Sequence, residues 1–78
     1  MAYHVVSVLL RKPISLMKAR EWLLEHGYVY RKVHETAEFL RFRQQDPEPL
    51  ERTGWRFRTS HLGEVGELVV AYPPRHVK

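Results

Sequence analysis

Two short segments of the sequence share an arginine-phenylalanine-arginine triplet. Residues 38–44 read EFLRFRQ and residues 54–60 read GWRFRTS. The guanidinium group of arginine is planar and always charged, and its N–H donors match the oxygens of a phosphate or a carboxylate. The chemistry that these residues suggest is the non-covalent binding of an anion. The candidate ligand-binding arginines are Arg41, Arg43, Arg56 and Arg58.

The alternation of side chains along a strand predicts where the four arginines lie. Neighbouring residues of a strand point to opposite faces, so the apolar residues of each segment are separated from its arginines. We expect the apolar set to face the core, and its members are Leu40, Phe42, Trp55 and Phe57. The four arginines then share the opposite face, and pairing of the two strands clusters them. Like charges that face each other across strands cost up to about 1 kcal/mol per pair, so this cluster needs a counter-charge.

Three sources of negative charge can meet this need. The first is the chain itself, whose carboxylates lie on neighbouring predicted strands and loops: Glu35, Glu38, Asp46, Glu48, Glu51, Glu64 and Glu67. The second is the phosphate backbone of a nucleic acid, and the third is an acidic protein surface or another anion. The residues alone leave these alternatives open.

Further cations and aromatic rings can extend such a surface. The additional cations are Lys18, Arg20, Arg31 and Lys32. Phe39 and Tyr30 are interleaved with basic residues, and a sheet face that carries both kinds of side chain can stack bases while it holds phosphates. The alternative is that the rings pack in the core, because a small chain without cysteine needs all the aromatic area it can bury. We expect Trp22, Phe42 and Phe57 in the core.

Metal and catalytic sites have little support in the sequence. The chain has five histidines and no cysteine, and no two histidines have the i, i+3 or i+4 spacing of a helical metal site. His34 and Thr36 form a single H-x-T triplet, whereas the phosphoesterases that use this motif carry two copies. Glycine loops that cradle phosphates are also missing. We predict no metal site, no cofactor, no catalytic residue and no enzymatic activity.

The elements that must position these residues follow from periodicity and breakers. A valine- and leucine-rich run predicts a buried strand over residues 3–10. Ser15 is placed as the N-cap of a helix that begins at Leu16, and Gly27 favours the end of that helix. Two hairpins are expected downstream, one joining residues 28–36 to 37–44 and one joining residues 55–61 to 66–72. Between them, prolines and acidic residues predict an exposed loop over residues 46–54.

This order, a strand, a helix and then four strands, predicts an α+β fold in which one helix packs on a largely antiparallel sheet of four to five strands. We expect residues 1–72 to form one compact domain and residues 73–78 a basic C-terminal tail, because two prolines end the last strand. A chain of 78 residues buries only roughly 60% of its unfolded surface, which leaves little room for a deep cleft.

Composition and charge agree with a small folded domain. Hydrophobic residues make up 44% of the chain, charged residues make up 28%, and the formal net charge is +4 at pH 7. The excess of arginine favours an anionic partner, although a charge of this size also keeps many small proteins soluble. The apolar run at residues 5–10 is too short to span a membrane, so no membrane partner is expected.

Three longer motifs carry a resemblance to a known kind of domain. They read KAREWLLEHGY at residues 18–28, HETAEFLRFRQQDP at residues 34–47 and FRTSHLGEVGELVVAY at residues 57–72. Together they resemble a small, poorly characterised domain of bacteriophage and large DNA virus proteins, found alone or beside head-morphogenesis and protease segments. The resemblance covers about four fifths of the chain and implies a viral origin. It assigns no chemical role to the matching residues, which include Lys18, Arg20, Trp22, His26, Thr36, Arg41, Arg43 and Arg58.

The resemblance and the basic triplets together suggest two functions. The first is a non-enzymatic viral binding protein whose basic sheet face holds nucleic acid or another phosphate-rich ligand. The second is a virion component or an inhibitor of a host factor, a protein-interaction module that can form a homodimer through a sheet edge. In either case the expected location is the host cytoplasm or the virion.

Overall fold

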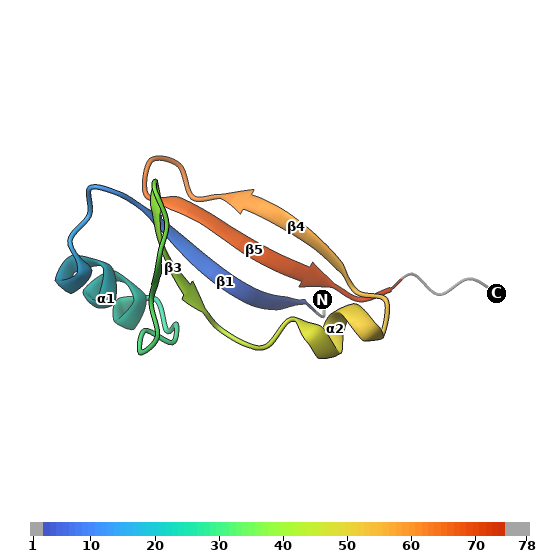
Figure 1. Cartoon of the computed structure of the whole chain (residues 1–78). Helices are drawn as coiled ribbons and strands as arrows, with labels where there is room; N and C mark the ends of the chain where they lie inside the picture. Colours follow the sequence, from blue (N-terminus) through green and yellow to red (C-terminus); the bar gives the residue numbers. More distant parts are fainter. Residues whose placement is uncertain (1–2, 75–78) are drawn as a thin grey trace.

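The computed structural model describes residues 3–74 (Figure 1). Five strands form one antiparallel sheet in the order β2-β3-β1-β5-β4. The elements are β1 (His4–Arg11), α1 (Leu16–Glu25), β2 (His34–Glu35), β3 (Phe39–Arg43), α2 (Glu48–Arg52), β4 (Arg56–His61) and β5 (Gly66–Tyr72). The predicted α+β class is confirmed. Residues 75–78 of the predicted basic tail lie outside the described residues.

β1 lies in the middle of the sheet because its residues can be buried on both faces. It pairs with β3 on one side and with β5 on the other. Its apolar run supplies Val6, Val8 and Leu10, which are at most 2% exposed, and Ser7 between them is also fully buried. A bulge between Val5 and Ser7 shifts the register with β5 by one residue.

α1 begins and ends at the predicted residues. The Ser15 hydroxyl accepts a hydrogen bond from the backbone N–H of Lys18 at 3.2 Å, which caps the first turn. Gly27 adopts a left-handed φ of 79°, which lets the N–H of Tyr28 reach the carbonyl of Leu23 at 2.9 Å. These local signals are sufficient to set both ends of the helix.

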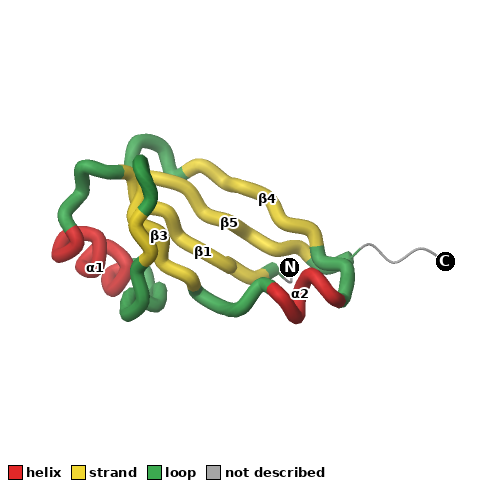
Figure 2. Tube along the Cα trace, viewed as in Figure 1, coloured by secondary structure: helices red, strands yellow, loops and turns green. Residues whose placement is uncertain are grey.

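One face of the sheet packs against α1, and we call it the helix face. The core on this face consists of Val8, Leu10, Ala19, Leu23, Leu40 and Phe42. The expected burial of Leu40 and Phe42 is therefore confirmed. We call the opposite side of the sheet, turned away from α1, the outer face. Figure 2 shows α1 near one end of the sheet and α2 near the other, so α1 covers only part of the helix face.

The expected loop at residues 46–54 contains a short helix, α2. The Asp46 carboxylate accepts a hydrogen bond from the N–H of Glu48 at 3.0 Å, and the carbonyl of Pro47 accepts one from Glu51 at 2.9 Å. Proline breaks a strand, but it is tolerated in the first turn of a helix, where its missing N–H needs no partner. The loop prediction was wrong because it used proline only as a breaker.

The first strand of the expected hairpin at residues 28–44 is also shorter than predicted. β2 contains only His34 and Glu35, which pair with β3. Upstream of β2, the side-chain amide of Gln44 makes the hydrogen bonds that a neighbouring strand would otherwise make to the backbone of Val29. Its Oε1 accepts from the N–H of Val29 at 2.7 Å, and its Nε2 donates to the carbonyl of Val29 at 2.9 Å. A side-chain amide therefore satisfies the backbone of a segment that the sequence pattern assigned to the sheet.

Candidate anion-binding surface

β3 presents its two arginines on the outer face. Leu40 and Phe42 belong to the core, so the alternation of the strand turns Arg41 and Arg43 away from α1. Phe39 shares this side of the strand. Its predicted position beside the arginines is confirmed.

β4 presents its two arginines on the helix face. Arg58 lies opposite Val70 in the ladder, and Arg56 lies opposite Tyr72. Leu68, two residues before Val70, packs against the core, so this side of β5 belongs to the helix face. Both arginines are exposed, because they lie on an edge strand at the part of this face that α1 leaves open.

The predicted cluster of four arginines is therefore wrong. β1 and β5 lie between β3 and β4, and the two arginine pairs point to opposite faces. The bulky residues of the second segment, GWRFRTS, lie on the outer face: Phe57 pairs with Ala71, and the ring centroid of Trp55 lies 5.1 Å from that of His4. The expectation that Trp55 and Phe57 face the helix is corrected in the same way, and both are only half-buried.

The β3 arginines line a hollow on the outer face. Its volume is about 160 Å³, and its lining residues are Lys32, Val33, His34, Arg41 and Arg43. His34 lies opposite Arg41 in the β2-β3 ladder, and Lys32 precedes β2 by two residues. Like-charged side chains that line one hollow repel each other, and a bound anion removes that repulsion. We call this hollow the β3 site.

Two contacts orient the cations at the β3 site. The Nε of Arg41 donates a weak hydrogen bond of 3.5 Å to the hydroxyl of the buried Ser7 on β1. Arg11, also on β1, lies opposite Phe39, and its guanidinium carbon is 5.0 Å from the centre of the Phe39 ring. Sequence reasoning missed Arg11 because it ended the first strand at residue 10. Extending the alternation by one residue would have placed Arg11 on this face.

None of the chain's carboxylates neutralises the β3 site among residues 3–74. The three ion pairs in this part of the chain join Lys12 to Glu35, Arg52 to Glu48 and His61 to Glu67. None of them involves Lys32, Arg41 or Arg43. The predicted alternative of internal neutralisation by Glu35, Glu38, Asp46, Glu48 or Glu51 is therefore not observed in the described residues.

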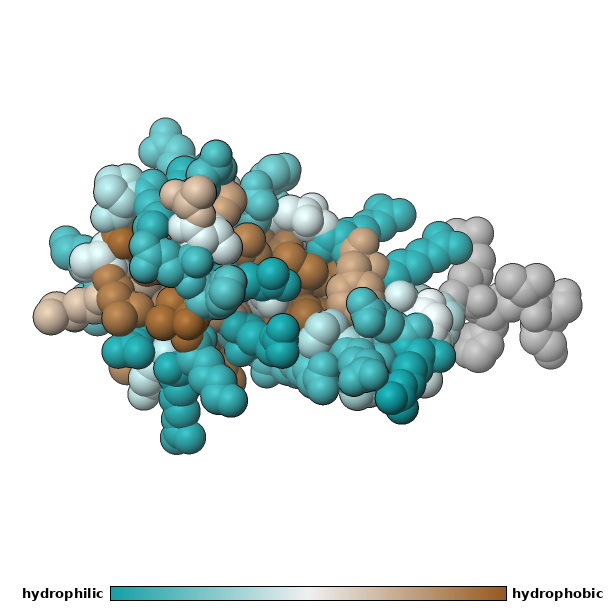
Figure 3. All heavy atoms as spheres, in the orientation of Figure 1, coloured by the Kyte–Doolittle hydropathy of each residue, from teal (hydrophilic) through white to brown (hydrophobic). Residues whose placement is uncertain are grey.

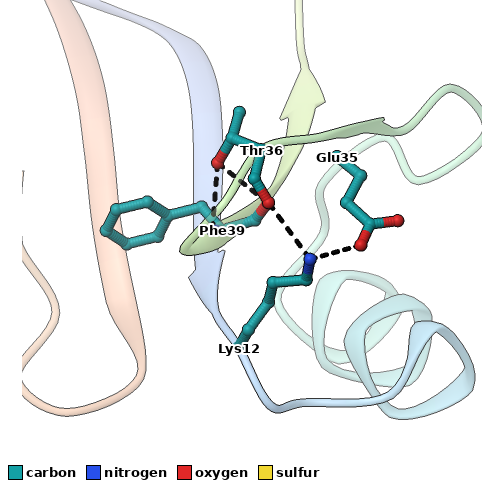
Figure 4. A network of polar contacts seen from close by, with 4 residues as sticks. All are labelled: Lys12, Glu35, Thr36 and Phe39. Atoms are coloured by element: carbon teal, nitrogen blue, oxygen red, sulfur yellow. Dashed lines mark hydrogen bonds and ion pairs between the residues drawn. The ribbon is translucent and has the colours of Figure 1, made fainter.

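The Lys12–Glu35 pair fixes the hairpin that carries the β3 site (Figure 4). The Lys12 ammonium contacts the Glu35 carboxylate and donates to the carbonyl of Thr36 at 3.1 Å. The Thr36 hydroxyl in turn accepts from the N–H of Phe39 at 3.0 Å. The hydrogen bond from Lys12, together with its positive charge, holds the pKa of Glu35 below its ordinary value. The Glu35 carboxylate therefore pairs with Lys12 and not with the cations of the β3 site.

The β4 arginines line a separate hollow of about 250 Å³ on the helix face. Its other lining residues are Tyr72 and Pro73. The ring of Tyr72 lies 6.0 Å from that of Tyr3, so aromatic side chains border these cations as well. No single phosphate can contact both arginine pairs, because the sheet lies between them.

The remaining predicted cations and rings lie elsewhere. Tyr30 and Arg20 line a hollow beside α1, on the other side of the sheet from the β3 site, and Lys18 is an exposed residue of α1. Arg31 lines another hollow with residues 27–30. Of the four additional cations, only Lys32 joins the β3 arginines. The others were grouped with them because they carry the same charge, which does not determine the face on which they lie.

Within residues 3–74, no group of three or more histidine and acidic side chains is placed to hold a metal ion. No helix in this range is long and apolar enough to cross a membrane. No family model, curated protein or solved structure matches the chain.

Proposed function

We propose that this chain is a non-enzymatic binding protein whose outer sheet face holds single-stranded nucleic acid, with phosphates at the β3 site. In line with the resemblance to phage and viral domains, we propose that it acts in the host cytoplasm or in the virion. The observation that carries the proposal is the hollow lined by Lys32, Arg41 and Arg43, none of which has a carboxylate within ion-pair distance in the described residues.

The aromatic residues of the outer face favour nucleic acid over a purely acidic partner. Phe39 lies beside the β3 site, and Trp55 and Phe57 lie at the opposite edge of the same face. All three are only partly buried. Proteins that bind single strands combine cations that follow the backbone with rings on which bases stack, and each stacked base contributes about 1–3 kcal/mol. A single strand that crosses the sheet from β3 to β4 can use both kinds of contact.

The sheet edges give less support to the alternative, a module that self-assembles by strand pairing. β2 is an edge strand of only two residues. β4, at the other edge, carries exposed Arg56 and Arg58, and an antiparallel pair of two β4 strands would bring four arginines onto one face. Short edge strands and charged side chains are the features with which proteins prevent edge pairing.

Salt titration of binding tests the proposed function directly. The full chain is titrated against a fluorescent single-stranded oligonucleotide at increasing salt, with poly-glutamate of similar charge as the comparison polymer. For single strands, a plot of log affinity against log salt concentration has a slope of about −0.7 per phosphate contact. Three cations therefore predict a slope of about −2. We expect the oligonucleotide to bind more tightly than poly-glutamate, because only the oligonucleotide has bases to stack.

Equal or tighter binding of poly-glutamate would favour the acidic-protein alternative. An oligonucleotide affinity that does not change with salt would contradict the proposal altogether.

A further inference from the structure

The outward side of α1 is unusually apolar for an exposed helix. Met17 is 72% exposed and Leu24 is 63% exposed, and Leu16 and Tyr30 are also exposed beside them. These residues, with Arg20 and Glu21, line a hollow of about 440 Å³. Figure 3 shows hydrophobic residues at the surface of the end of the molecule that carries α1. A group of exposed apolar side chains bordered by charged ones is a common feature of interaction sites.

Four residues of this surface form one stripe along the helix. Met17, Arg20, Glu21 and Leu24 have the spacing i, i+3, i+4 and i+7, and they point away from the buried Ala19 and Leu23. The two apolar residues lie at the ends of the stripe, and a cation and a carboxylate lie side by side at its centre. Read from either end, the stripe presents an apolar residue, two opposite charges and an apolar residue.

We propose that this stripe, which we call the α1 stripe, pairs with the same stripe of a second copy of the chain. The helices run antiparallel around a twofold axis that passes between Arg20 and Glu21. Met17 then packs against Leu24 of the second copy, and Arg20 meets Glu21 of the second copy, each contact occurring twice as symmetry requires. The long stems of the charged residues cover apolar surface between the two ends.

The charges determine the orientation of the pair. In a parallel pair, Arg20 would face Arg20 and Glu21 would face Glu21, which is repulsive. Only the antiparallel arrangement makes both central contacts attractive. The charges therefore specify the arrangement, as e and g charges do in coiled coils, while the apolar contacts supply most of the affinity. A ten-residue helix makes a small interface, so we expect a dissociation constant of about 10 μM to 1 mM.

This dimer is independent of the proposed nucleic-acid binding, because it uses the other side of the sheet. α1 lies on the helix face and the β3 site lies on the outer face. Dimerisation through the α1 stripe leaves both outer faces accessible, on the far sides of the dimer. If the chain also binds nucleic acid, one dimer can hold two strands.

Charge exchange at the centre of the stripe tests the dimer. Sedimentation velocity of the full chain is measured from low concentration to about 1 mM, the upper limit of the expected dissociation constant. The wild type is expected to dimerise as concentration rises. R20E and E21R are each expected to weaken dimerisation at least about tenfold, because each places like charges at both central contacts. The double variant R20E/E21R restores opposite charges and is expected to recover the dimer.

A mixture of the two single variants provides the control for folding. R20E carries two adjacent carboxylates and E21R carries two adjacent arginines, so the mixture is expected to form a heterodimer although neither variant dimerises alone. Circular dichroism of each variant checks that α1 is intact. A wild type that stays monomeric up to about 1 mM would overturn the proposal. Single variants that dimerise as well as the wild type, or a mixture that does not associate, would also overturn it.

Discussion

The two arginine-phenylalanine-arginine triplets have the same letters and opposite environments. In β3, the central Phe42 is fully buried under α1 and the arginines face outward. In β4, the central Phe57 is half-buried on the outer face and the arginines lie on the helix face. The difference arises from strand order: β3 adjoins the central strand beneath α1, whereas β4 is an edge strand. The same local sequence can therefore serve as a core strand or as an edge strand.

The largest difference between the triplets should appear when each phenylalanine is replaced by alanine. We expect Phe42→Ala to lower the free energy of unfolding by about 3–5 kcal/mol, since it removes a large ring from a packed core. Phe57→Ala should cost about 1–2 kcal/mol, because a half-buried ring loses less area and leaves no closed cavity. Urea denaturation of both variants measures the two costs. Equal costs would mean that β4 is packed as tightly as β3.

A smaller effect is expected from the segment of residues 28–33, which supplies Lys32 to the β3 site. Among the described residues, no such segment contributes to the hollow beside the β4 arginines. Gln44→Ala removes both hydrogen bonds to Val29 and should cost about 1–2 kcal/mol, and it should also weaken oligonucleotide binding. Gln45→Ala is the matched control, because Gln45 makes one long bond of 3.4 Å to the carbonyl of Val5. The control should cost less than about 0.5 kcal/mol and leave binding unchanged. If both variants bind equally well, residues 28–33 do not shape the site.

Features set by neighbouring residues were predictable from the sequence. The ends of α1 depend on Ser15 and Gly27, and the burial of Leu40 and Phe42 depends on alternation within one strand. The position of Phe39 beside the β3 arginines follows from the same alternation. These predictions needed no knowledge of which strands pair.

Features set by distant residues were not predictable in this way. The order β2-β3-β1-β5-β4 inserts the first and last strands between the two triplets, and no local pattern records that order. Phe57 and Trp55 are apolar residues of a strand and were assigned to the core, but His4 and Ala71 meet them on the outer face. The exposure of Met17 and Leu24 on the outward side of α1 was not predicted, because a helix was expected to have one apolar face only.

The most direct test compares the two arginine pairs as paired double variants. R41A/R43A and R56A/R58A remove the same residues and the same charge from opposite faces of the sheet. Their affinities for one fluorescent single-stranded oligonucleotide are measured at one salt concentration, with circular dichroism as a check on folding. We expect R41A/R43A to bind at least about tenfold more weakly than the wild type, and R56A/R58A to stay within about threefold. Equal losses, or a greater loss for R56A/R58A, would contradict the assignment of the phosphate site to β3.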